Sequence, residues 1–380
     1  MLCSFKRAAG AAGRARRAGT HALVAALAIA LQGGCGGGDS AAPPATTHLA
    51  LVVNGQTHDV TSYTVDAASG DLARTGEPVA AGGTPLSIAV HPGGRFVYVA
   101  NFGSSSLSAY RIDCAGGALQ ALGATTRAGI GPASIAIAPS GRFAYVAHAI
   151  SGDVVAYSID AATGALSVLG VPAKAGASPL SIAIDPTGRF AYVANAGSND
   201  ITSYAIDPAD GGLFAVGGPV AAGASPLAVA IDPTGRFAYV ANSGSNSVSA
   251  YTIDSRTGAL AAIGQAVAVG QAPGFIAIHP TGRFVYATNV GSGSASAFIV
   301  DAGTGALTSA GPPTLAGTTP RSIAVDPSGR YLFVPNTDSD SISRYAVDAD
   351  NGSLTPVGET AVPGSAPVAM AFAPAQAGNK

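Results

Sequence analysis

The chain has 380 residues, of which 19 are basic and 21 acidic, and only 11% are charged, against roughly 25% in an average domain. It has no basic stripe of the kind that phosphate recognition requires, so we expect it to bind no nucleic acid. Its three cysteines, Cys3, Cys35 and Cys114, offer neither a disulfide framework nor metal-ligand spacing. Nucleotide-binding and metal motifs are also missing from the sequence, so we expect no metal and no cofactor.

Residues 1–35 have the pattern of an export signal. Five basic residues and no acidic residue precede Cys35, and the apolar stretch 21–31 is too short to span a bilayer as a mature helix. The phrase Q-G-G-C, which ends at Cys35, resembles the lipidation site of bacterial lipoproteins. We therefore expect an exported protein, held in the bacterial envelope (periplasmic or outer membrane) by a lipid on Cys35. The alternatives are simple secretion and a retained cytosolic N-terminus.

Residues 36–47 are rich in Gly, Ala, Pro and Thr and are predicted to form a flexible tether. Loss of the segment before Cys35 leaves 14 basic and 21 acidic residues, so the mature chain has a net charge of −7. This acidic balance again argues against a nucleic-acid partner.

From residue 48 onward the chain repeats every 47 residues. Seven prolines mark the period, at Pro85, Pro132, Pro179, Pro226, Pro273, Pro320 and Pro367. Each full copy holds four short runs rich in Ile, Val, Tyr and Phe, bounded by Gly, Pro, Asn and Asp. In the copy that begins at Pro179 these runs are 180–185, 189–195, 201–207 and 213–218. Four strands in a repeat of this length predict an all-β propeller with one blade per copy.

Six copies are complete, from residue 85 to residue 366, and a seventh is divided between the two ends of the repeat region. Residues 48–84 supply its second, third and fourth strands, and residues 367–375 supply its first. We predict a seven-bladed β-propeller over 48–376, closed by pairing the C-terminal strand with the N-terminal three and followed by a tail at 377–380. Closure removes two free sheet edges, which are otherwise prone to aggregation. We also expect a monomer.

The seven copies separate structure from function within one sequence. A residue that every copy shares is attributed to the blade, and a residue that departs from its siblings is a candidate for function. In each blade the connection before the proline and the loop after the second strand lie on one face. Ligand sites of propellers normally lie on such a face near the axis.

The second strands end in a ring of six asparagines and one histidine: Asn54, Asn101, His148, Asn195, Asn242, Asn289 and Asn336. A histidine that acts as general base needs a nearby carboxylate or cation. Asp153 lies in the loop after His148, and Arg127 and Lys174 occupy equivalent places in the flanking connections. Asn195, in the next copy, is a further candidate ligand contact. The alternative is that His148 replaces asparagine as a polar loop cap.

Arg321 is the second departure from the repeat. Its siblings after the blade-opening proline are Leu86, Ala133, Leu180, Leu227, Gly274 and Val368. A guanidinium there would sit at the axial mouth and could hold a carboxylate or phosphate. The alternative is a surface arginine whose stem packs on the protein while its head stays in water.

The phrases GRFAYVAN, ITSYAID and D-x-x-TG-x-L resemble the seven-bladed lactonase family, which includes bacterial 6-phosphogluconolactonase and fungal carboxymuconate cycloisomerases. They are similar also to the YVTN-repeat propellers of exported and surface proteins. The resemblance covers about 48–376 and implies a propeller that hydrolyses a lactone. Lactonase members carry G-P-R-H at a blade mouth and an acidic residue in an N-E-L phrase. Here residues 319–322 read T-P-R-S, and none of the loops after the second strands carries glutamate.

Two hypotheses follow. In the first, the protein hydrolyses a lactone, with His148 as base and Arg321, Arg127 or Lys174 polarising the carbonyl or binding a substrate anion. In the second, it is a non-catalytic propeller of the cell envelope that binds a small ligand or a protein on the same face. The unbroken regularity of the repeat favours the second, because catalytic sites commonly use lids or specialised loops.

Overall fold

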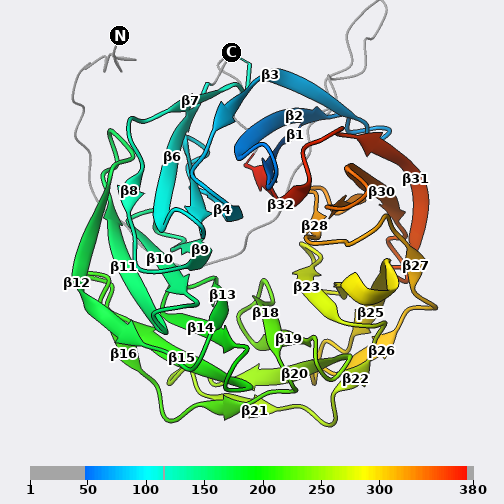
Figure 1. Ribbon diagram of the computed structural model, residues 1–380. Helices are drawn as coiled ribbons and strands as arrows, with labels where there is room; N and C mark the ends of the chain where they lie inside the picture. The colour runs from blue at the N-terminus through cyan, green and yellow to red at the C-terminus, as the bar shows by residue number, and fades with distance from the viewer. Residues whose placement is uncertain (1–47, 114–115, 375–380) are drawn as a thin grey trace, which may run out of the picture. The chain divides into compact units, whose positions relative to one another are not determined.

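The structure is a computed structural model that describes residues 48–113 and 116–374. Seven antiparallel sheets surround a central axis, and each runs from an innermost strand to an outermost strand at the rim (Figure 1). This confirms the all-β seven-bladed propeller expected from the repeat. Among the described residues, no helix is long and apolar enough to cross a membrane.

The blades are numbered along the chain. Blades 1 to 6 span 85–131, 132–178, 179–225, 226–272, 273–319 and 320–366, and blade 7 combines 48–84 with 367–374. The innermost strands of blades 1 to 7 are β4 (Pro85–Val90), β9 (Pro132–Ile137), β13 (Pro179–Ile184), β18 (Pro226–Ile231), β23 (Pro273–Ile278), β28 (Ala324–Val325) and β32 (Pro367–Ala373). The second strands are β5 (Phe96–Asn101), β10 (Phe143–His148), β14 (Phe190–Asn195), β19 (Phe237–Asn242), β24 (Phe284–Asn289), β29 (Tyr331–Asn336) and β1 (His48–Asn54).

The third strands are β6 (Ser106–Ile112), β11 (Asp153–Ile159), β15 (Asp200–Ile206), β20 (Ser247–Ile253), β25 (Ser294–Val300), β30 (Ser341–Val347) and β2 (Asp59–Val65). A single short 3-10 helix, η1 (Val290–Ser292), lies between β24 and β25 in the described part of the chain.

The fourth strand departs from the expectation of one continuous strand per blade. It is continuous in blades 2, 6 and 7, as β12 (Leu166–Lys174), β31 (Leu354–Ala361) and β3 (Leu72–Ala80). In the other blades it is divided into β7 (Leu119–Ala121) and β8 (Thr126–Arg127), β16 (Leu213–Ala215) and β17 (Val220–Ala221), β21 (Leu260–Ala262) and β22 (Val267–Ala268), and β26 (Leu307–Ser309) and β27 (Thr314–Leu315). A glycine with positive φ stands at the same repeat position in every blade, such as Gly170 and Gly217. This glycine introduces a β-bulge into the fourth strand. In the blades with a divided fourth strand, pairing with the third strand is interrupted at the bulge.

Apolar cores lie between neighbouring blades. The second strands of blades 1 to 6 are buried along their whole length, and β1 is buried except at Leu49, because each is covered by a blade on both sides. Polar bonds reinforce these interfaces at fixed repeat positions. The Tyr192 hydroxyl donates to the Gly258 carbonyl of the next blade at 3.0 Å, and the equivalent bond recurs from Tyr98, Tyr145 and Tyr239.

Closure of the ring follows the predicted scheme. β32 pairs antiparallel with β1, from Leu49 opposite Ala373 to Asn54 opposite Pro367. The sheet order is β3-β2-β1-β32, so strands from the two ends of the propeller make one blade. In Figure 1 the red β32 accordingly lies beside the blue β1.

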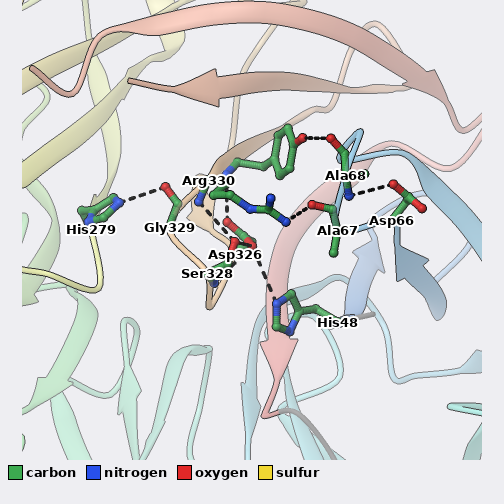
Figure 2. A network of polar contacts seen from close by, with 10 residues as sticks. His48, Asp66, Ala67, Ala68, His279, Asp326, Ser328, Gly329 and Arg330 are labelled. Carbon is green, nitrogen blue, oxygen red and sulfur yellow. Dashed lines mark hydrogen bonds and ion pairs between the residues drawn. The ribbon is translucent and has the colours of Figure 1, made fainter. Parts of the chain in front are cut away.

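A polar network on the face opposite the proline connections joins blade 6 to blade 7 (Figure 2). The Arg330 guanidinium donates to the Ala67 carbonyl across the blade boundary. His48 occupies the position that arginine holds in the other blades, and its Nε2 lies 3.9 Å from Oδ2 of the buried Asp326. The boundary between blades 6 and 7 thus has both an arginine bond like those at other boundaries and a contact between a buried histidine and a buried carboxylate.

Candidate functional site

His148 stands at the end of β10 with its side chain fully buried. Its Nδ1 lies 3.0 Å from Oδ1 of Asp153, and the backbone N–H of Gly129 donates to its Nε2 at 3.1 Å. An N–H group can only donate, so Nε2 carries no proton and the Nδ1–H donates to the carboxylate. The structure therefore brings His148 and Asp153 together, but both ring nitrogens are occupied, Nδ1 by Asp153 within blade 2 and Nε2 by Gly129 at the end of blade 1.

In all six asparagines of the ring Nδ2 donates to side chains five and seven residues ahead, and Asn242 also reproduces the bond made by Gly129. The backbone N–H of Gly223, at the end of blade 3, donates to Oδ1 of Asn242 in blade 4 at 3.1 Å, in the place of the Gly129 bond. Nδ2 of Asn242 donates to Ser247 and Ser249, five and seven residues ahead. In blade 2 the residue seven positions after His148 is Val155, which cannot accept a hydrogen bond. None is needed there, because the neutral His148 ring has a single N–H, and it already donates to Asp153. The geometry of His148 is that of the loop cap.

The pKa of His148 lies below its ordinary value because burial penalises the charged ring. The Asp153 carboxylate opposes that shift without cancelling it. Protonation would place a second hydrogen on Nε2, which faces the Gly129 N–H, so the charged ring would lose an acceptor and gain a clash.

Acid should therefore destabilise the protein through His148. The unfolded chain takes up a proton near pH 6.5, whereas the folded ring resists it. The stability that His148 contributes is complete above pH 6.5 and is lost as pH falls through the lowered folded pKa. We expect the slope to reach at most about 1.4 kcal/mol per pH unit. Denaturant unfolding at pH 7.5, 6.5 and 5.5 measures it, and an asparagine variant of residue 148 should lack this component.

We expect His148→Asn combined with Val155→Thr to fold as stably as the wild type within about 1 kcal/mol, because it copies the bonds of blade 3. His148→Asn alone leaves one amide hydrogen facing Val155 and should cost about 1–3 kcal/mol. His148→Ala should cost at least as much, since it also opens a cavity. If His148 were a general base, all three variants would lose turnover, and the double variant would regain stability but not activity.

Lys174 and Arg127 lie away from the axis. Lys174 ends the outermost strand of blade 2, where it pairs in register with Asp153, and Arg127 lies on the outer edge of blade 1 opposite Ser106. Three strand spacings separate the innermost and outermost strands of a blade, or about 14 Å. The structure thus groups Lys174 with Asp153 near the rim.

Asn195 is fully buried at the end of β14. Its Nδ2 donates to Oδ1 of Asp200 at 2.6 Å and to Oγ1 of Thr202 at 2.8 Å. These bonds cap the loop between β14 and β15, and they leave the amide nitrogen with both hydrogens used.

Arg321 lies in a different environment, a hollow of about 350 Å³ at the axis, here called the axial hollow. Its wall takes the residue after the blade-opening proline from every blade: Leu86, Ala133, Leu180, Leu227, Gly274, Arg321 and Val368. One contribution from each of seven blades places the axial hollow on the ring axis. Phe275 and Val290 add to its apolar wall, and Arg321 is the one charged residue among the described residues that line it.

Blade 6 differs locally where Arg321 stands. Its innermost strand β28 has only two residues, and the backbone N–H of Arg321 donates to the Pro335 carbonyl at 3.0 Å. The other complete blades carry Ala or Thr where blade 6 has Pro335. Proline has no N–H to donate to the innermost strand, so regular pairing is lost there.

The Arg321 side chain is exposed at the mouth of the axial hollow. In the described ranges, no carboxylate lies within ion-pair distance of it. Besides Arg321, the polar residues of the wall are Ser243 and Thr319, and the Thr319 hydroxyl donates to Oδ2 of Asp338 at 2.5 Å. The guanidinium is therefore available to an external anion.

The described residues that line the axial hollow include no His, Asp, Glu, Lys, Tyr or Cys. A water attacking a carbonyl there would have no adjacent side-chain base. Over 48–113 and 116–374, no three His, Cys, Asp or Glu side chains cluster as metal ligands would. The predicted lipidation site Cys35, with the signal segment 1–35, the tether 36–47 and the tail 377–380, lies outside the described residues.

Sequence reasoning missed Phe275 and Pro335. Phe275 lies two residues after a blade-opening proline, where its siblings are Ser or Ala. Pro335 interrupts the Y-V-A-N phrase that precedes the loops. The comparison among copies that singled out Arg321 would have found both residues had it been applied to every column of the repeat.

Three stretches of the chain, 86–179, 171–274 and 270–372, match the family described as lactonase, seven-bladed beta-propeller. No curated protein sequence matches the chain. Among solved structures, a candidate 6-phosphogluconolactonase of Bacteroides uniformis superposes with a TM-score of 0.78 at 22% identity, covering 86% of this chain and 99% of that one. A second candidate, from Bacteroides fragilis, gives 0.77 at 24% identity, covering 88% and 99%.

A periplasmic gluconolactonase of Pseudomonas aeruginosa superposes with a TM-score of 0.75 at 23% identity, covering 87% of this chain and 100% of that one. At these identities the superpositions show a shared fold. The family match together spans residues 86–372, which is most of the propeller. The chain therefore belongs to the seven-bladed β-propeller lactonase family.

Proposed function

We propose that this protein binds a small organic carboxylate, or the lactone from which it derives, in the axial hollow. The observation that carries the proposal is a single guanidinium, Arg321, on an otherwise mainly apolar wall. Arginine binds carboxylates through two parallel hydrogen bonds and polarises a carbonyl oxygen through one. Leu86, Leu180 and Leu227 supply an apolar surface for the body of the ligand. This wall suits a ligand with an apolar body better than a polyhydroxylated sugar.

Binding without turnover is the form of the proposal that the geometry favours. Lactone hydrolysis needs an activated water as well as a polarised carbonyl. The described residues that line the axial hollow offer no side-chain base, and the two ring nitrogens of His148 are engaged elsewhere. Hydrolysis stays as the second candidate, because the family to which the chain belongs is named for that reaction.

Matched pairs of a lactone and its hydroxy acid test the two candidates together. Calorimetry should detect binding of pairs with apolar substituents and weaker binding of gluconolactone and gluconate. Proton release in a pH-stat should stay at the rate of buffer alone. Turnover above buffer that disappears in an Arg321 variant would favour the hydrolase. Absence of binding by every acid and every lactone would contradict the ligand site altogether.

We also propose that the propeller is exported and anchored through a lipid on Cys35. The basic segment, the short apolar stretch and the Q-G-G-C phrase support this proposal. Mass spectrometry of the mature protein should find a diacylglycerol-bearing N-terminal cysteine, and Cys35→Ser should release the protein from the membrane fraction. An unmodified N-terminus in a soluble fraction would contradict the anchor.

A further inference from the structure

A second hollow of about 170 Å³ also lies on the axis, here called the lower hollow. Its wall includes the next residue of every blade, one position further along the innermost strands: Ser87, Ser134, Ser181, Ala228, Phe275, Ser322 and Ala369. Five residues line both hollows and therefore form their common boundary: Leu86, Ala133, Leu180, Leu227 and Phe275.

Phe275 is the exception in its ring, because its siblings carry hydroxyl or methyl side chains. Blade 5 reverses the usual order of a large residue followed by a small one. Gly274 contributes no side chain at the position where three blades have leucine. Phe275 places an aromatic ring at the next position, where the other blades have Ser or Ala. A side chain at Gly274 would meet Val290, since an added Cβ would lie 2.7 Å from Cγ2. Phe275 thus lines both hollows, and it also packs against the apolar core between blades 5 and 6.

We propose that Phe275 is the floor of the ligand hollow and sets the greatest length of ligand that the propeller accepts. This inference rests on the proposed function. A carboxylate held by Arg321 at the mouth directs its apolar body along the axis toward Phe275. The ligand class is then a short monocarboxylate whose body ends above the boundary ring. Removing the aromatic ring joins the two hollows and admits a longer body.

The repeat shows that serine is tolerated at this position. Oγ of Ser87, Ser134, Ser181 and Ser322 each accepts a backbone N–H from the innermost strand of the following blade, at 3.1–3.3 Å. The equivalent donor for residue 275 is the N–H of Ile323, 48 residues ahead as in those four blades. Phe275→Ser therefore supplies an inter-blade bond while it removes the floor. Ala228→Ser is the matched control, because it adds the same hydroxyl to the same ring without removing an aromatic side chain.

Calorimetry with straight-chain carboxylates from butanoate to dodecanoate tests the floor. In the wild type we expect affinity to rise about fourfold per added methylene and then to stop rising or fall once the chain reaches Phe275. In Phe275→Ser this limit should move to longer chains, and in Ala228→Ser it should not move. Circular dichroism checks that both variants fold.

The possible results distinguish the role of Phe275 from the proposed function. A limit at the same chain length in Phe275→Ser and the wild type, with binding still dependent on Arg321, overturns the floor and leaves the proposed function standing. A wild type with no limit across the series also overturns the floor. A wild type that binds none of these carboxylates overturns the proposed function and the floor together.

Discussion

Removing residues 367–380 should leave a chain that no longer unfolds in one cooperative transition at the temperature of the intact propeller. The deletion takes away β32, whose Val368, Ala369 and Met370 are buried between blades. Losing the burial of the valine and methionine alone costs about 3–6 kcal/mol. Net stabilities of proteins are about 5–15 kcal/mol. The backbone N–H and C=O groups of β1 that pair with β32 would also be exposed, and they could then pair with strands of other chains.

The deletion can be matched by a control and by a rescue. A chain that ends at Pro374 keeps β32 and should match the wild type in calorimetry. Residues 367–374 placed before His48 through a Thr-Gly link, as in the turn of blade 3, should restore the transition because blade 7 becomes continuous. A deletion variant that keeps the wild-type melting temperature would contradict the closing role of β32.

Replacing Arg321 by leucine should weaken the binding of small carboxylates by about 10- to 100-fold. A hydrogen bond to a charged group contributes roughly 1.5–3 kcal/mol, and each 1.4 kcal/mol is a factor of ten in affinity. Leucine is the residue at the equivalent position of blades 1, 3 and 4. The variant should therefore fold normally, and calorimetry should report a change in binding alone.

Arg321→Lys separates charge from geometry at the same site. Lysine keeps the positive charge but lacks the planar pair of donors that matches a carboxylate. We expect an affinity between those of the wild type and Arg321→Leu. Lys174→Leu is the control for charge on the same face, and it should change little because Lys174 lies on the outermost strand. Unchanged binding in Arg321→Leu would exclude the axial site.

The repeat was sufficient to predict the blades, their number and the divided seventh blade. Each of these depends on a pattern that recurs in every copy, such as the prolines and the D-x-x-x-G turns. The division of the fourth strand was not predicted. It depends on how far the chain departs from the sheet after a bulge at residues such as Gly217, and that distance is a property of three-dimensional packing.

The candidate site was predicted in part. Arg321 was singled out by sequence and lies on the axis, as expected for the residue that follows the blade-opening proline. The sequence placed Lys174 and Arg127 on the same face of the propeller as Arg321. It could not give their distance from the axis, because that face extends across all four strands of a blade. Val155 was a sequence signal for the hydrogen bonds of His148. The other copies have Ser or Thr at this position to accept the second amide hydrogen of asparagine, and a neutral histidine has no second hydrogen to donate.

A crystal structure of the protein with a bound short carboxylate, such as pentanoate, tests the central claim most directly. The account predicts a carboxylate on the propeller axis about 3 Å from the Arg321 guanidinium, with its chain directed toward Phe275. A carboxylate bound beside Lys174 and Arg127, with the axial hollow free of ligand, would contradict it.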